Sequence, residues 1–175
     1  MSGRLVILDR DGVINHDSVE FIKSPEEWRA IDGSIDAIVA LSQAGFTVAV
    51  ATNQSGVGRK IIDLPTLASI HEKLRDAVRQ AGGDLGRIVF CPHHPDDGCD
   101  CRKPKPELLL RLSRQYELPL EGTPVIGDSE RDLQAARAVN ARPILVLTGN
   151  GRKTAAALVE KGDNCLLYTS DAADE

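Results

Sequence analysis

The sequence predicts an α/β protein whose parallel sheet is covered by helices on both faces. Short apolar segments alternate along the chain with longer segments whose apolar residues recur at helical spacing. The short segments are rich in Val, Ile and Leu and lack a regular polar alternation, as expected for strands that are buried on both faces. Strands that alternate with helices in this way form parallel sheets.

In the N-terminal half, the apolar run at residues 5–8 predicts the first strand. Residues 34–44 carry their apolar side chains on one helical stripe, and the glycine that follows predicts the end of this helix. The apolar segment 46–51 predicts a second strand. A longer helix is expected at residues 64–81, because two glycines come directly after it.

In the C-terminal half, the same alternation predicts three more strands and three more helices. We expect the strands at residues 87–91, 123–126 and 143–147, and the helices at residues 106–116, 130–139 and 151–161.

The 175 residues suit one domain with a full hydrophobic core. We expect this domain to span residues 1–164, because the sequence shows no internal repeat or linker. Residues 165–175 fit no expected final strand and resemble the translated read-through of a sequencing adapter. We therefore expect this segment to be non-native, and the natural protein to continue past Asn164 with different residues.

Composition and charge narrow the classes of function. The 26 acidic and 21 basic residues give a net charge of −5, which argues against nucleic-acid binding because such proteins usually carry a basic surplus. No apolar run approaches the ~20 residues that cross a bilayer, and the N-terminus lacks a secretory pattern. We expect a monomeric cytoplasmic protein with neither membrane nor nucleic-acid partners.

Carboxylates follow two of the expected strands at the point where each strand ends. Asp9 and Asp11 come directly after the first strand, and Asp128 follows the fourth, with Asp132 beyond it. The carboxyl ends of parallel strands are where such folds bind ligands. Two carboxylates this close repel each other unless a cation lies between them, and Mg²⁺ prefers oxygen ligands. A carboxylate can also attack a phosphoryl group.

Phosphate-binding groups follow two other strands. Thr52 ends the second strand and can donate a hydrogen bond to a phosphoryl oxygen. Arg102 and Lys103 follow the third strand, and both residue types bind phosphate, Arg through two parallel hydrogen bonds and Lys as a compact charge. Together with the aspartates, these residues predict a magnesium-dependent phosphatase.

A cysteine- and histidine-rich segment, residues 91–101, predicts a zinc loop. Two close ligand pairs, Cys91 with His93 and Cys99 with Cys101, can enclose one tetrahedral ion. Four protein ligands leave no open coordination position, so we expect a structural ion that fixes the loop carrying Arg102 and Lys103. His94 is an alternative to His93 as the fourth ligand.

The motifs resemble the four motifs of the haloacid dehalogenase (HAD) superfamily, in the same order and across residues 5–132. They are Asp9-Arg-Asp-Gly-Val, Thr52, Lys103 and Gly127-Asp-Ser. The resemblance implies a Rossmann-like sheet, Mg²⁺ and an aspartyl-phosphate intermediate. The implied roles are Asp9 as nucleophile, Asp11 as acid and base, Thr52 and Lys103 as phosphoryl-binding residues, and Asp9, the Asp11 carbonyl and Asp128 as magnesium ligands. No long insert predicts a large cap domain.

The zinc loop followed by Cys-Arg-Lys-Pro is similar to two groups within this superfamily, the heptose 1,7-bisphosphate phosphatases and the histidinol-phosphatases. The segments 7–15, 31–37 and 51–56 look more like the heptose group. This resemblance implies removal of the 7-phosphate from D-glycero-D-manno-heptose 1,7-bisphosphate, on the route to ADP-heptose and lipopolysaccharide. By matching positions, it implies substrate contacts from Asp17, Asn53, Gln54, Ser55, Arg102 and Lys103.

Other functions fit the sequence less well. Histidinol phosphate stays open as an alternative substrate, because the same zinc-loop spacing occurs in both groups, and the preferred anomer of the sugar stays open too. A zinc-bearing nucleic-acid module would need a basic stripe and stacking aromatics, but aromatic residues make up only 3% of the chain. A catalytically inactive phosphate-binding protein would lack one of the key groups, and all of them are present.

Overall fold

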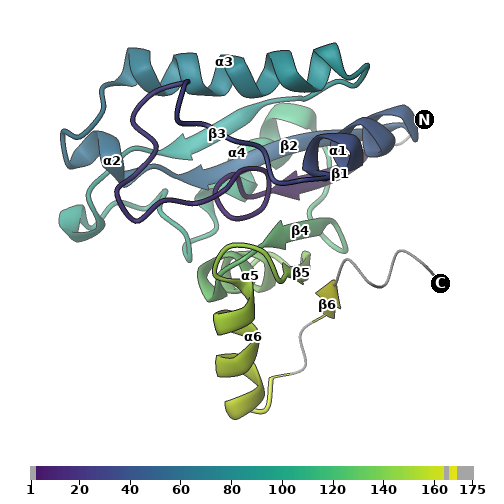
Figure 1. Ribbon diagram of the computed structural model, residues 1–175. Helices are drawn as coiled ribbons and strands as arrows, with labels where there is room; N and C mark the ends of the chain where they lie inside the picture. Colours follow the sequence, from purple (N-terminus) through teal and green to yellow (C-terminus); the bar gives the residue numbers. More distant parts are fainter. Residues whose placement is uncertain (1–2, 164–165, 169–175) are drawn as a thin grey trace.

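In the computed structural model, six parallel strands form one sheet in the order β3-β2-β1-β4-β5-β6 (Figure 1). The structure describes residues 3–163 and the backbone of residues 166–168. The strands are β1 (Arg4–Leu8), β2 (Phe46–Asn53), β3 (Ile88–Cys91), β4 (Pro124–Gly127), β5 (Arg142–Val146) and β6 (Leu166–Tyr168). The predicted α/β fold is confirmed, and each of the five expected strands is present.

The five predicted helices are also present, with ends that differ from the expected ones by a few residues. They are α1 (Ser34–Gln43), α3 (Leu64–Gln80), α4 (Glu107–Tyr116), α5 (Glu130–Arg137) and α6 (Gly151–Glu160). Two single turns were not predicted, α2 (Ser55–Gly58) and the 3-10 turn η1 (Pro95–Asp97). Segments this short are below the length over which a helical stripe can be recognised.

Both faces of the sheet are buried, as the apolar strands predicted. Along β1, Leu5 and Ile7 pack in a cluster with α4 and α5, whereas Val6 and Leu8 pack with α1 and α3 on the other face. Figure 1 shows α3 lying along the sheet, close to β2 and β3. In the part of the chain that the structure describes, no helix has the length and hydropathy of a membrane span.

The C-terminal segment differs from its expected structure. Leu166–Tyr168 form β6, which pairs with β5 from Ile144↔Leu166 to Val146↔Tyr168. The expectation that residues 165–175 contain no strand is therefore wrong for these three residues, because a free edge of β5 accepts them. Residues 164, 165 and 169–175 lie outside the described part of the chain, and the non-native origin of the segment stays a prediction.

The strand order brings the expected site residues together. β1 lies between β2 and β4. The chain adds β2 and β3 on one side of β1, and then β4, β5 and β6 on the other side. The β1–β4 register pairs Leu8 with Ile126, so Asp9 and Asp128 leave neighbouring strands at the same edge. Such a switch point is where open α/β sheets bind ligands.

Candidate active site

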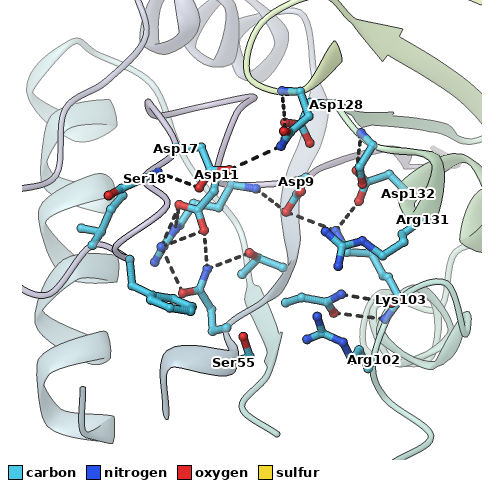
Figure 2. Close-up of a pocket in the computed structure, with 18 residues that line it drawn as sticks. Asp9, Asp11, Asp17, Ser18, Ser55, Arg102, Lys103, Asp128, Arg131 and Asp132 are labelled. Carbon is cyan, nitrogen blue, oxygen red and sulfur yellow. Dashed lines mark hydrogen bonds and ion pairs between the residues drawn. The ribbon is translucent and has the colours of Figure 1, made fainter. Parts of the chain in front are cut away.

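A cavity of about 230 Å³ lies at the carboxyl ends of the central strands (Figure 2). All ten residues predicted to bind substrate or magnesium or to act in catalysis line this pocket. They are Asp9, Asp11, Asp17, Thr52, Asn53, Gln54, Ser55, Arg102, Lys103 and Asp128. The lining also contains residues to which the sequence assigned no role, among them Arg10, Asp132 and Asn150.

Lys103 is held at the centre of the pocket by two carboxylates and a carbonyl. Its Nζ lies 2.6 Å from Asp132 Oδ1 and 3.1 Å from Asp9 Oδ1, and it donates to the Ala51 carbonyl oxygen at 2.7 Å. The side chain is buried, which lowers the pKa of the ammonium, but the two carboxylates outweigh this and raise the pKa above its usual value. Lys103 is therefore a fixed positive charge beside Asp9.

Asp11 lies in a network of hydrogen bonds on the other side of Asp9 (Figure 2). Arg10 donates from Nε and Nη2 to Asp11 Oδ1 at 3.0 and 2.8 Å, and Asn15 Nδ2 donates to the same oxygen at 2.9 Å. Gln54 Nε2 donates to Asp11 Oδ2 at 2.8 Å. Burial disfavours the ionised carboxylate, but Arg10 and these donors outweigh it and hold the pKa of Asp11 below its usual range.

Asp9 and Asp128 are the carboxylates available to a cation. One oxygen from each of Asp9, Asp128 and Asp132 lies within 4.8 Å of the others. Both oxygens of Asp132 are engaged, Oδ1 by Lys103 and Oδ2 by Ser129, whereas Asp9 contacts Lys103 through Oδ1. Burial raises the pKa of Asp9 to about 7 and that of Asp128 to about 6, so a cation would stabilise both ionised groups. These oxygen donors suit Mg²⁺. A contribution from the Asp11 carbonyl stays a prediction.

Gly12 is required for the close approach of Asp128. Its φ is +80°, a conformation that side chains disfavour, and a Cβ at this position would lie 2.1 Å from Asp128 Oδ2. The same carboxylate oxygen accepts hydrogen bonds from Asn150 N at 2.8 Å and from Asn150 Nδ2 at 3.2 Å. Asp128 is thus fixed by the turn after β1 and by the start of α6.

Two residues that were predicted to contact the substrate form side-chain hydrogen bonds within the protein. Asn53 pairs with the backbone of Lys103, and Gln54 bridges Arg10, Asp11 and Thr52. Both residues still line the pocket, as does Ser55 in the first turn of α2.

Asp17 and Arg102 lie at the edge of the pocket. Asp17 Oδ2 is 3.4 Å from Asn150 Nδ2, which donates to it. Arg102 and Arg131 both line the pocket, and burial, followed by the positive charge of Arg131, lowers the pKa of Arg102. The other predicted cation, Lys103, is deeper in the pocket.

The four predicted zinc ligands converge on one point. Sγ of Cys99 lies 3.6 Å from Sγ of Cys91 and 3.7 Å from Sγ of Cys101, and His93 Nδ1 lies 3.6 and 3.2 Å from Cys91 and Cys101. A tetrahedral zinc ion with Zn–S bonds of about 2.3 Å separates its sulfur ligands by about 3.8 Å. The geometry fits zinc and is far too wide for a disulfide, whose S–S bond is about 2.05 Å.

His93, and not His94, faces this cluster. His94 Nδ1 instead accepts a hydrogen bond from Asp96 N at 3.2 Å and caps the 3-10 turn η1. The alternative ligand is thereby engaged elsewhere. The loop leads directly from Cys101 to Arg102 and Lys103, so a bound ion would hold the chain just before the pocket.

Three buried residues of the site received no role from the sequence. Asp132 pairs with Lys103, Arg10 pairs with Asp11, and Asn15 donates to Asp11. A signal was available for Asp132, which lies four residues after Asp128 and so in the first turn of the helix that follows β4. Arg10 and Asn15 flank Asp11 in sequence, but their side-chain directions could not be read from spacing.

A Rossmann-like sheet with a nucleophile-bearing strand, a buried lysine and an acidic fourth strand defines a hydrolase of the HAD type. A HAD-hydrolase-like family model matches residues 100–171, and a polynucleotide kinase 3 phosphatase model matches residues 5–131. The chain is 56% identical over 172 residues to the D-glycero-beta-D-manno-heptose-1,7-bisphosphate 7-phosphatase of Pseudomonas putida, covering 97% of this chain and 96% of the relative. It belongs to that phosphatase family.

Further relatives carry the same name. The Bordetella bronchiseptica protein is 54% identical over 153 residues, covering 87% of this chain and 86% of the relative. The crystal structure of D,D-heptose 1,7-bisphosphate phosphatase from B. bronchiseptica, in complex with magnesium and phosphate, matches with a TM-score of 0.89 at 50% identity and covers 94% of this chain and 92% of that one. The Burkholderia thailandensis enzyme structure matches with a TM-score of 0.72 at 42% identity, over 96% of this chain and 92% of that one.

Proposed function

We propose that this protein removes the 7-phosphate of D-glycero-β-D-manno-heptose 1,7-bisphosphate, and that Asp9 is the nucleophile. The observation that carries the proposal is the position of Lys103 Nζ, 3.1 Å from Asp9 Oδ1, beside Asp128 at the switch point of the sheet. The names of the relatives support the heptose bisphosphate over histidinol phosphate, and they support the β anomer, which the sequence left open.

In the first step, an oxygen of Asp9 attacks the phosphorus of the 7-phosphate, and the bond from phosphorus to the sugar oxygen breaks. Asp11 donates a proton to that leaving oxygen, which gives the free 7-hydroxyl and an aspartyl-phosphate. Lys103 and Thr52 bind the transferring phosphoryl group and stabilise its negative charge. The first step requires the Asp11 carboxyl to turn away from Arg10, because that guanidinium stabilises the ionised form.

In the second step, water attacks the phosphorus of the aspartyl-phosphate and gives its proton to Asp11. The bond from phosphorus to Asp9 breaks, which releases inorganic phosphate and restores the Asp9 carboxylate. The ionised Asp11, held by Arg10, Asn15 and Gln54, is the form that accepts this proton.

Two metal ions are part of the proposal. Asp9 and Asp128, with the Asp11 carbonyl, would hold Mg²⁺, which supplies positive charge that keeps Asp9 ionised and neutralises phosphoryl oxygens. Cys91, His93, Cys99 and Cys101 would hold a structural Zn²⁺. Its effect would be indirect, through the position of the loop that carries Lys103.

A phosphate-release assay with Mg²⁺ tests the proposal. The substrates are the β and α anomers of the heptose bisphosphate and histidinol phosphate, and the control is Asp9→Asn, assayed fresh to limit deamidation. We expect release of one phosphate from the β anomer and no turnover by Asp9→Asn. A preference for histidinol phosphate would overturn the substrate assignment, and turnover by Asp9→Asn would overturn the mechanism.

We further infer that the protein acts as a cytoplasmic monomer without nucleic-acid partners. Three free cysteines in a metal-binding arrangement suit a reducing compartment. The net charge of −5 opposes binding to nucleic acid. Light scattering coupled to gel filtration would test the monomeric state.

A further inference from the structure

The pocket is lined by four cationic side chains that differ in their partners. They are Arg10, Arg102, Lys103 and Arg131. Arg10 pairs with Asp11 at 2.8 Å, and Lys103 pairs with Asp9 and Asp132 at 3.1 and 2.6 Å. Their charges are therefore balanced within the protein before any ligand binds.

The positive charges of Arg102 and Arg131 are not balanced in this way. Among the residues that the structure describes, neither guanidinium forms an ion pair with a carboxylate, and Arg102 Nη1 is buried without a hydrogen-bond partner. Arg102 follows the zinc loop, and Arg131 belongs to α5. Figure 2 shows both on the Lys103 side of the pocket, away from Asp17. Two unbalanced guanidinium groups on one wall favour a bound anion.

The position of Arg131 has no evident benefit for its own helix. It is the second residue of α5, and the positive end of the helix dipole disfavours a cation in the first turn. This helix is stabilised at its start by Ser129 and Asp132, which form a capping box. Arg131 is exposed, and it stands next to Asp132, the residue that fixes Lys103. The backbone of Arg131 is therefore held by α5 close to the residue that fixes Lys103.

We propose that Arg131, together with Arg102, binds the phosphate that the enzyme does not hydrolyse, and that Arg131 thereby determines which phosphate reaches Asp9. The inference rests on the proposed function, since it requires a substrate with two phosphates. A guanidinium donates two parallel hydrogen bonds to a phosphate, so two of them recognise a phosphate dianion by shape as well as by charge.

Kinetics with two substrates test this role. The pair is the heptose 1,7-bisphosphate and heptose 7-phosphate, which lacks the retained phosphate. For Arg131→Gln, we expect KM for the bisphosphate to rise about 10- to 100-fold, in line with the loss of a charge-assisted hydrogen bond. We expect kcat to change less than about twofold and KM for heptose 7-phosphate to stay the same. Arg131→Lys keeps the positive charge but loses the paired hydrogen-bond donors of the guanidinium. Its KM for the bisphosphate should therefore lie between those of the unmodified protein and Arg131→Gln.

The matched control is Arg152→Gln. Arg152 is also an exposed arginine in the first turn of a helix, α6, but it does not line the pocket. Its kinetics should equal those of the unmodified protein. Phosphorus NMR of the products gives a second readout, since Arg131→Gln should yield heptose 7-phosphate beside heptose 1-phosphate, whereas the unmodified protein should yield heptose 1-phosphate.

The outcomes separate this inference from the proposed function. If the unmodified protein releases no phosphate from the bisphosphate, the proposed function fails and the inference fails with it. If the unmodified protein is active but Arg131→Gln behaves like Arg152→Gln, only the inference is overturned. An equal rise of KM for both substrates would also overturn it, because Arg131 would then act on the reacting phosphate or on the fold.

Discussion

The side-chain amide of Asn53 pairs with the backbone of Lys103. Asn53 Nδ2 donates to the Lys103 carbonyl oxygen and Lys103 N donates to Asn53 Oδ1, both at 3.1 Å. This double hydrogen bond joins the end of β2 to the segment after the zinc loop. It fixes the main chain from which the Lys103 ammonium reaches Asp9, so Asn53 serves the site through Lys103.

Replacing Asn53 should therefore reduce the rate more than it weakens substrate binding. For Asn53→Ala we expect kcat to fall roughly 10- to 100-fold, since small displacements of a catalytic group have effects of this size. KM should change little. Steady-state kinetics with the heptose bisphosphate measure both. A rise in KM at unchanged kcat would instead support the direct substrate contact that the sequence predicted for Asn53.

Asp132→Asn should destabilise the fold as well as the site. Lys103 and Asp132 are both buried, and removing one partner leaves a buried charge with less compensation. We expect a loss of about 3 kcal/mol in the free energy of unfolding, measured by urea denaturation, together with a lower kcat. Asp36→Asn, at an exposed site in the first turn of α1, is the control; it should leave kcat unchanged and cost under about 1 kcal/mol through the helix dipole. A loss in Asp132→Asn no larger than in Asp36→Asn would contradict this account.

Gly12→Ala should weaken magnesium activation. The new methyl group would displace Asp128, because the ideal Cβ lies 2.1 Å from Oδ2. We expect the Mg²⁺ concentration for half-maximal activity to rise severalfold. Gly33→Ala is a matched control, since Gly33 has φ +79° but no atom within 4 Å of its Cβ. It should show only the cost of the left-handed backbone, roughly 1 kcal/mol. Identical magnesium titrations of the two variants would refute the steric argument.

Removal of the predicted zinc ion should lower the activity of the enzyme without altering the carboxylates of the pocket. We expect one zinc per chain by elemental analysis, and less in Cys99→Ser, which lacks one of the four ligands. Treatment with a zinc chelator in excess Mg²⁺ should lower activity and make residues 91–103 more sensitive to proteases, since the ion would hold this loop. Protein that is purified without chelator and contains no zinc would contradict the site.

His71 should contribute a loss of stability on acidification, whereas the raised pKa values of Asp9 and Asp128 act in the opposite direction. Burial, aided by Arg10, lowers the pKa of His71 from 6.5 to about 3. At this residue the unfolded state therefore binds more protons below pH 6.5, and the contribution of His71 to stability is lost as the pH falls from 6.5 towards 3. At pH 5 this amounts to about 2 kcal/mol.

Between pH 7 and pH 5, the free energy of unfolding of His71→Leu should rise relative to that of the unmodified protein by about 2 kcal/mol, as measured by urea denaturation at each pH. His16→Gln, at an exposed position, should follow the unmodified protein. Parallel pH profiles for His71→Leu and the unmodified protein would show that another group governs acid sensitivity.

The order of strands and helices could be predicted because the signals are local. The run Leu5 to Leu8 is apolar throughout, and it packs on both faces of the sheet as that pattern requires. Gly45 and Gly82 end helices in left-handed conformations, at the positions where the sequence indicated a stop. In contrast, β6 could not be predicted, because three residues of strand depend on the free edge of β5.

For the site, the sequence alone determined which residues gather and what chemistry they can perform. Asp9, Asp128 and the predicted zinc ligands could be singled out because strand ends and ligand spacing are readable along one segment. The tertiary structure decided what each side chain does there. In the folded protein, the side chains of Asn53 and Gln54 form internal hydrogen bonds. Asp132 pairs with Lys103, which is 29 positions away in the sequence. Hydrogen bonds and ion pairs are set by distance and direction in space, and these depend on how separate elements pack.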